Sequence, residues 1–128
     1  MGIFDLLLET DAKKLKASNS KDCEIKRLSD VLGERFIVTC TPLTAEQIQY
    51  VGEVSKNNTE MKANIVLECC KLEGKSLKSK ELLEKFGVPT PIDALHKLFL
   101  PGEIYTLYET VNQLSGYNKD AVKEVKKR

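Results

Sequence analysis

Apolar residues recur at helical spacing through the last third of the chain. Leu100-Pro101-Gly102-Glu103 opens this stretch, and proline suits the first turn of a helix because its missing N–H needs no partner there. The apolar residues that follow at three- and four-residue steps are Ile104, Leu107, Tyr108, Val111 and Leu114. Gly116 stands where a left-handed residue would end the helix. The pattern predicts an amphipathic helix from Pro101 to Leu114.

The same spacing predicts four shorter helices before this one. The first begins at a capping-box pattern at Thr44, and Asn57 to Thr59 separates it from the second. Over Ile65 to Leu72 the apolar stripe of the second helix widens to most of its surface, which is typical of a helix surrounded by others. Ser79 and Thr90 cap the last two. We therefore expect Ile65 to Leu72 to be the centre of the core.

The first third of the chain has a different pattern. Ile3 to Leu8 is an apolar cluster that predicts a short amphipathic helix, either packed on the body or exposed for a partner chain. Cys23 to Leu28 and Arg35 to Thr41 are rich in β-branched and apolar residues, which predicts two strands. The link between them contains Gly33 and would serve as the return turn. An antiparallel β-hairpin that ends near Pro42 is the simplest account.

These elements predict an α+β fold that is mainly α. An N-terminal helix and one antiparallel β-hairpin are followed by a bundle of about five helices. The chain has 128 residues, the size of one ordinary domain, and no repeat or low-complexity tract divides it. Within a single domain of residues 1–128, we expect the helix and hairpin over 1–43, the bundle over 44–116 and a basic helical tail over 117–128.

Charge is unevenly distributed along the chain. The net charge is +1, but Lys119 to Arg128 carries five basic and two acidic residues, which leaves 15 basic and 17 acidic residues before it. Nucleic-acid-binding domains usually combine a basic face with aromatic residues that stack on bases, whereas this chain has no Trp and few clustered aromatics. The tail is better explained as a solvated helix end whose cations complement the helix dipole.

The cysteines and the single histidine give little support for catalysis or metal binding. Cys23, Cys40, Cys69 and Cys70 lack the paired C-x-x-C spacing of a zinc site, so we expect them to be small buried hydrophobic residues in a reducing cytosol. His96 is expected at the surface. A cysteine hydrolase that pairs Cys40 or Cys69 with His96 is the alternative, but no third group is recognisable that would orient them. We expect no catalytic residue, no metal and no cofactor.

The chain has no pattern that predicts membrane insertion. No segment approaches the roughly twenty apolar residues of a transmembrane helix. Met1 to Lys16 lacks the basic start and the apolar core of a signal peptide. We therefore expect a soluble cytoplasmic protein without membrane contacts.

Two stretches of the chain carry a family resemblance. The C-terminal stretch has Leu100 to Ile104, the turn Leu114-Ser115-Gly116-Tyr117, and Asp120-Ala121-Val122 followed by Glu124-Val125-Lys126. The upstream stretch has Ile25-Lys26-Arg27-Leu28, Phe36-Ile37-Val38 and Pro42-Leu43-Thr44. Together they resemble the XkdN-like tail assembly chaperones of contractile-tail phages and PBSX-like defective prophages, over most of the chain.

The resemblance implies a non-catalytic chaperone that binds the tape measure protein and recruits tail tube subunits without a cofactor. It also implies a cytoplasmic protein of the bacterial host cell that is absent from the mature particle. An apolar helical segment of the partner would bind in a groove between helices. The candidate partner-binding residues are Leu98, Phe99, Ile104, Tyr105, Tyr108 and Val111. The competing interpretation is that these residues form the core.

Two other functions stay open at this point. One is a structural tail component that is retained in the particle. The other is a small DNA-associated accessory factor that uses the basic C-terminal tail. Self-association is open as well, either through the Ile3 to Leu8 helix or through edge pairing of the hairpin.

Overall fold

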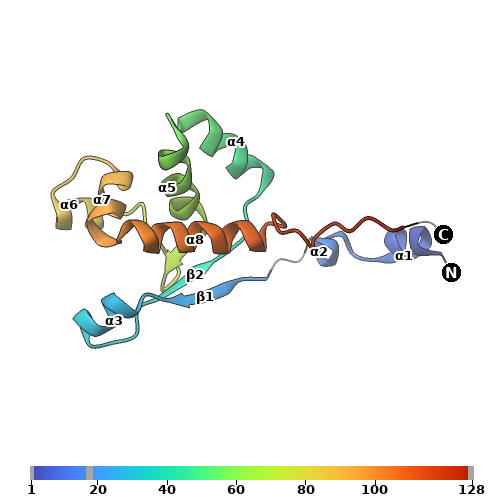
Figure 1. Ribbon diagram of the computed structural model, residues 1–128, viewed down its shortest axis with the longest axis horizontal. Helices are drawn as coiled ribbons and strands as arrows, with labels where there is room; N and C mark the ends of the chain where they lie inside the picture. Colours follow the sequence, from blue (N-terminus) through green and yellow to red (C-terminus); the bar gives the residue numbers. More distant parts are fainter. Residues whose placement is uncertain (1, 17–18, 127–128) are drawn as a thin grey trace.

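The computed structural model describes residues 2–16 and 19–126. Within these ranges it has eight helices and four short strands, and the α+β, mainly α class is confirmed (Figure 1). In chain order the elements are α1 (Ile3–Glu9), α2 (Ala12–Leu15), β1 (Lys21–Glu24), α3 (Lys26–Leu32), β2 (Ile37–Cys40), α4 (Ala45–Val54), α5 (Asn58–Cys69), β3 (Cys70–Leu72), β4 (Lys75–Ser76), α6 (Lys80–Phe86), α7 (Pro91–Leu98) and α8 (Pro101–Leu114). The predicted bundle of about five helices corresponds to α4–α8.

The four strands form one antiparallel sheet in the order β1-β2-β3-β4. In β1 and β2, Lys21 lies opposite Cys40, which confirms the predicted antiparallel pair. β3 then pairs with β2, with Val38 opposite Leu72. Because β3 follows directly from α5, the N-terminal strands and the helical bundle share a single sheet.

The prediction that Cys23 to Leu28 is one strand is wrong beyond Glu24, because the helix α3 begins at Lys26. Ile25 and Leu28 are both only 7% exposed, and a spacing of three places two residues on one face of a helix but on opposite faces of a strand. Gly33 ends α3 in the left-handed region with φ 76°. This glycine therefore caps a helix and is not a hairpin turn.

The second bundle helix is also shorter than predicted, because α5 ends at Cys69 and the next residues form β3. Glu73 and Gly74 both have positive φ, 51° and 75°, and they make the two-residue turn that joins β3 to β4. Such turns are usually marked by Asn-Gly or Asp-Gly. Glu-Gly is a weaker signal, which explains why the sequence did not predict this hairpin.

The predicted helical tail is the third correction, because residues 117–126 contain only turns and irregular chain. The last two residues of the predicted tail, 127 and 128, lie outside the described residues. Val122 and Val125 are 89% and 86% exposed, so no packing supports a helix there. Gly116 does end the preceding helix as predicted, with φ 90° and with the Tyr117 N–H bonded to the Asn112 carbonyl at 3.0 Å.

The core lies between the sheet and the helices α5 and α8 (Figure 1), and α8 packs against both α5 and β2. Val38 and Cys40 of β2 and Phe36 just before it are buried, as the alternation predicted. From α5 and β3, Val66 and Cys70 are fully buried, so the expectation that the Ile65 to Leu72 stretch supplies the centre of the core is confirmed, although it ends as a strand.

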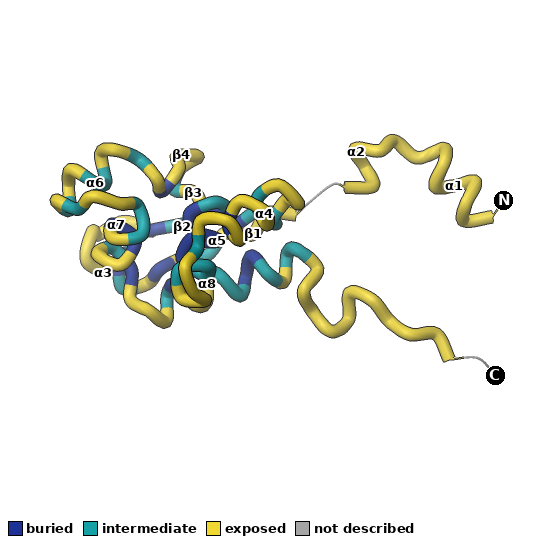
Figure 2. The backbone as a smooth tube through the Cα atoms, turned by 90° about the horizontal axis from the view of Figure 1, so that it is seen from above, coloured by how far each residue is buried: buried dark blue, intermediate teal, exposed yellow. Residues whose placement is uncertain are grey.

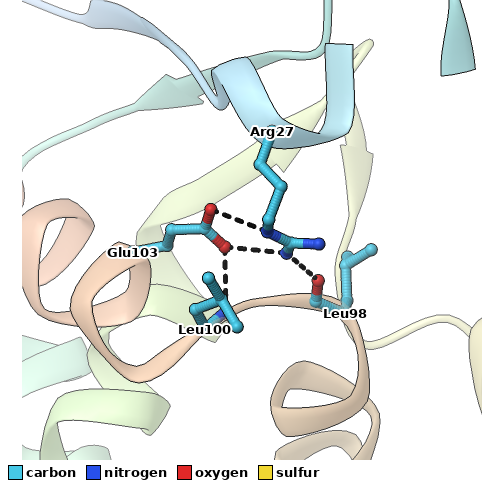
Figure 3. A network of polar contacts seen from close by, with 4 residues as sticks. All are labelled: Arg27, Leu98, Leu100 and Glu103. Carbon is cyan, nitrogen blue, oxygen red and sulfur yellow. Dashed lines mark hydrogen bonds and ion pairs between the residues drawn. The ribbon is translucent and has the colours of Figure 1, made fainter. Parts of the chain in front are cut away.

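One ion pair connects α3 to the corner between α7 and α8 (Figure 3). The Arg27 guanidinium donates from Nε to Glu103 Oε2 at 3.1 Å and from Nη2 to Glu103 Oε1 at 2.9 Å. Nη2 also donates to the Leu98 carbonyl at 2.9 Å, and Glu103 Oε1 accepts the Leu100 N–H at 2.8 Å. The hydrogen bond from Arg27 lowers the pKa of the Glu103 carboxyl. One side chain thus holds the end of α7 and the start of α8 together.

Replacing a buried leucine of α8 tests which residues form the core. Leu107 is 1% exposed, so Leu107→Ala should lower the free energy of unfolding by about 3 kcal/mol, because it removes buried methyl groups and leaves a cavity. Urea denaturation followed by circular dichroism measures the change. The matched control is Leu100→Ala at the 52% exposed leucine before α8, which should change the stability by less than about 1 kcal/mol. Equal losses in both variants would contradict the assigned core.

The lowered pKa of Glu103 predicts how the Arg27–Glu103 pair depends on pH. A carboxyl whose pKa is lower in the folded state stabilises the fold above its unfolded pKa, about 4.3, and loses that contribution as the pH falls through the folded value. Glu103→Gln should therefore melt at a lower temperature than the wild type at pH 7, and the difference should shrink as the pH falls below about 4 and through the folded pKa. Melting curves from about pH 2 to pH 8 measure this, and a difference that stays constant over the whole range would contradict it.

Candidate functional site

An apolar groove lies between α4, α5 and α8 and has a volume of about 370 Å³. Its inner surface includes Val51 and Ile65, which are 3% and 7% exposed. The full set of lining residues is Leu43, Ile48, Val51, Gly52, Met61, Ile65, Tyr108, Asn112 and Tyr117. None of these is charged. A groove of this size and lining is suited to a few apolar side chains of a partner.

A pair of tyrosines lies on α8 where it borders the groove. Tyr108 lines the groove, and the ring of Tyr105, one helical turn earlier, lies 6.1 Å from it between centroids. Lys62 Nζ from α5 lies 5.2 Å and 5.6 Å from the centroids of the Tyr105 and Tyr108 rings. Hydrogen bonding to Glu109 raises the pKa of the Tyr105 phenol, so this hydroxyl stays protonated. The pair combines a large apolar area with polar ends, which is typical of residues at protein interfaces.

The structure divides the six predicted partner-binding residues into two groups. Phe99, Ile104 and Val111 are 2%, 6% and 0% exposed and belong to the core. Leu98 and Tyr108 are half-buried, and Tyr105 is 49% exposed. Only the two tyrosines are both accessible and adjacent to the groove. The sequence did not single out the groove residues of α4 and α5. On each helix they form an apolar stripe that looks the same as a stripe facing the core.

The family model of the phage XkdN-like tail assembly chaperone proteins matches residues 4–127. The chain belongs to this family. The crystal structure of a protein named yqbn has a similar fold, with a TM-score of 0.61 and 16% sequence identity over 85% of this chain and 98% of that chain. No curated protein sequence matches the chain.

This member of the tail assembly chaperone family also presents an exposed N-terminal helix. α1 has no buried residue, and Ile3, Phe4 and Leu8 are 82%, 67% and 69% exposed. α1 and α2 extend from the body on the same side as the exposed C-terminal tail (Figure 2). Of the two alternatives drawn from the sequence, the structure has the helix exposed rather than packed on the body. It is a second apolar surface, separate from the groove.

The cysteines and the histidine lie where the sequence predicted. Cys40, Cys69 and Cys70 are buried and Cys23 is half-buried, while His96 is exposed. Burial raises the pKa of the Cys69 thiol to about 12, so this sulfur stays protonated at neutral pH. Among residues 2–16 and 19–126, no group of three or more Cys, His, Asp or Glu side chains is placed to hold a metal ion.

No described helix combines the length with the hydropathy that crossing a lipid bilayer requires.

Introducing charged residues into α1 tests whether that helix contributes to the stability of the body. Because Phe4 and Leu8 are 67% and 69% exposed, Phe4→Asp combined with Leu8→Asp should shift the melting temperature by no more than about 2 °C. Differential scanning calorimetry of the full chain measures this. A decrease of more than about 5 °C would mean that α1 packs on the body in solution.

Proposed function

We propose that this chaperone binds apolar helical segments of the tape measure protein in the groove between α4, α5 and α8, and recruits tail tube subunits while they are held there. It makes and breaks no covalent bond. It acts in the cytoplasm of the bacterial host cell and is absent from the finished particle. The family membership supports the assembly role, and the apolar groove is the observation that carries the proposed binding mode.

The groove has the chemistry that an amphipathic helix needs. A bound helix presents side chains at i, i+3, i+4 and i+7 along one stripe, and a groove between helices accepts such a stripe. Val51 and Ile65 would contact these side chains from below, and Met61 provides an unbranched side chain that can adjust its shape. Tyr105 and Tyr108 would cover the edge of the bound helix with their rings. Covering apolar stripes in this way would prevent a long partner from aggregating before assembly.

A second surface is needed if one molecule is to bind two partners. α1 is separate from the groove and has no buried residue, so its apolar side chains are free for another protein. We place the tail tube subunit on this surface. The two-surface arrangement requires no cofactor and no catalytic group.

Alanine substitution of the tyrosines tests the groove. Tyr105→Ala should weaken binding to the tape measure protein about tenfold, because the side chain is an exposed aromatic contact at the groove edge. Tyr108→Ala should weaken it as well. Binding is measured by affinity capture and by calorimetry with the tape measure protein of the same tail module, and helical circular dichroism checks the fold of each variant.

Tyr50 provides a matched control. It is 45% exposed on α4, and its ring centroid lies 5.0 Å from Lys78 Nζ, much as Tyr105 lies beside Lys62. Tyr105 packs its ring beside the groove-lining Tyr108, whereas the ring of Tyr50 packs beside Lys78, which does not line the groove. Tyr50→Ala should leave binding unchanged. Equal effects of Tyr50→Ala and Tyr105→Ala would contradict the groove assignment. Stoichiometric recovery of the chain from purified particles by mass spectrometry would contradict the chaperone role and favour a structural tail component.

A further inference from the structure

Two buried cysteines lie opposite each other on neighbouring strands of the sheet. Cys40 on β2 lies directly opposite Cys70 on β3, and their sulfur atoms are 3.5 Å apart. Both residues are 0% exposed. The Thr41 N–H bonds to the Cys69 carbonyl at 2.9 Å, just beyond the pair. In an antiparallel ladder this pattern makes Cys40 and Cys70 a non-hydrogen-bonded pair, the type in which the two Cα atoms are closest, about 4.5 Å apart.

The other two cysteines are less well placed to bond with Cys40. Cys23 lies opposite Val38, so it is a diagonal neighbour of Cys40, and the two thiols influence each other through a side-chain hydrogen bond. The Cα atoms of diagonal pairs are typically about 7–8 Å apart, however, which is longer than a disulfide normally spans. Cys69, the last residue of α5, donates from Sγ to Gln47 Oε1 of α4 at 3.8 Å. Directly opposed, non-hydrogen-bonded residues are within the range of Cα separations that disulfides use.

We propose that Cys40 and Cys70 are a latent disulfide that closes when the protein meets a hydroperoxide. Because neither sulfur is exposed in the closed fold, the reaction requires a local opening of the β3–β4 hairpin at the edge of the sheet. The Cys40 thiolate then attacks one peroxide oxygen, the O–O bond breaks, and Cys40 becomes a sulfenic acid as the other oxygen leaves as an alcohol or water. The Cys70 sulfur then attacks the Cys40 sulfur, the S–S bond forms, and the sulfenic oxygen leaves as water with the Cys70 proton. Two electrons pass from the two sulfurs to the peroxide.

The hydrogen bond between the two thiols supports this order of events. It lowers the pKa of the Cys40 thiol, and burial only partly opposes it. The same hydrogen bond and burial raise the pKa of Cys70. Cys40 is therefore the sulfur that loses its proton first, and Cys70 remains protonated until it attacks.

The bond would enclose the segment that forms most of the groove. The chain between Cys40 and Cys70 contains all of α4 and α5, which supply Ile48, Val51, Met61 and Ile65 to the lining. A disulfide that closes a loop on the order of 30 residues removes conformational freedom from the unfolded chain. Oxidation would thus stabilise α4 and α5 against unfolding without adding any side-chain contact in the groove.

The test treats the full-length native protein with hydrogen peroxide, alkylates the remaining thiols and maps the peptides by mass spectrometry. Cys69 and Cys70 fall in one tryptic peptide, so the Cys69→Ala variant assigns the bond to Cys70. We expect a mass loss of about 2 Da, a Cys40–Cys70 link that persists in Cys69→Ala and Cys23→Ala, and a melting temperature about 10 °C higher than that of the reduced protein.

Two results would overturn the proposal. One is a link from Cys40 to Cys23 in the native wild type, or the loss of the link to the shared Cys69–Cys70 peptide in Cys69→Ala. The other is four free thiols after a treatment that fully oxidises the urea-unfolded chain. Because Cys69→Ala keeps both bonding cysteines, the assignment does not depend on whether variants of Cys40 or Cys70 fold.

Discussion

The structure depends on burying one face of a small sheet beneath two crossing helices. Four short strands expose too little apolar area to be stable alone, and helices as short as α5 and α8 gain most of their stability from packing. Val38 from the sheet, Val66 from α5 and Val111 from α8 are all completely buried where these elements meet. The remaining elements are arranged around this contact. α7 packs against α5, and α4 also packs against α5 and forms one wall of the groove.

Much of this arrangement could be predicted from periodicity. Four of the five bundle helices carry clear start and stop residues, including the Thr44 capping box and the proline at the start of α8, and these were placed correctly. The second was predicted to continue to Leu72 but ends at Cys69. Elements that depend on long-range contacts could not be predicted in the same way. α3 is held by Arg27 bonding to residues more than 70 positions away, and β3 exists because β2 offers it an open edge. A local pattern contains no information about such partners.

The candidate site shows the same limit. Tyr105 and Tyr108 could be singled out because large amphipathic rings on a helix suggest an interface. Their neighbours Ile104 and Val111 have the same spacing but lie in the core, and sequence alone could not separate the two groups, since the boundary depends on where α5 crosses α8. The opposed pair of thiols was likewise hidden, because Cys70 was expected in a helix and became a neighbour of Cys40 only through strand register.

The walls of the groove differ in how firmly they are anchored. α5 buries six of its residues and α8 buries four, whereas α4 buries only Val51. The start of α8 is further immobilised by Arg27 on one side and by the edge-to-face contact of Phe36 with Phe99, 6.1 Å between centroids, on the other. α4 is therefore the compliant wall, since segments with few buried contacts open at the lowest free energy. Widening the groove by displacing α4 would therefore cost less free energy than displacing α5 or α8.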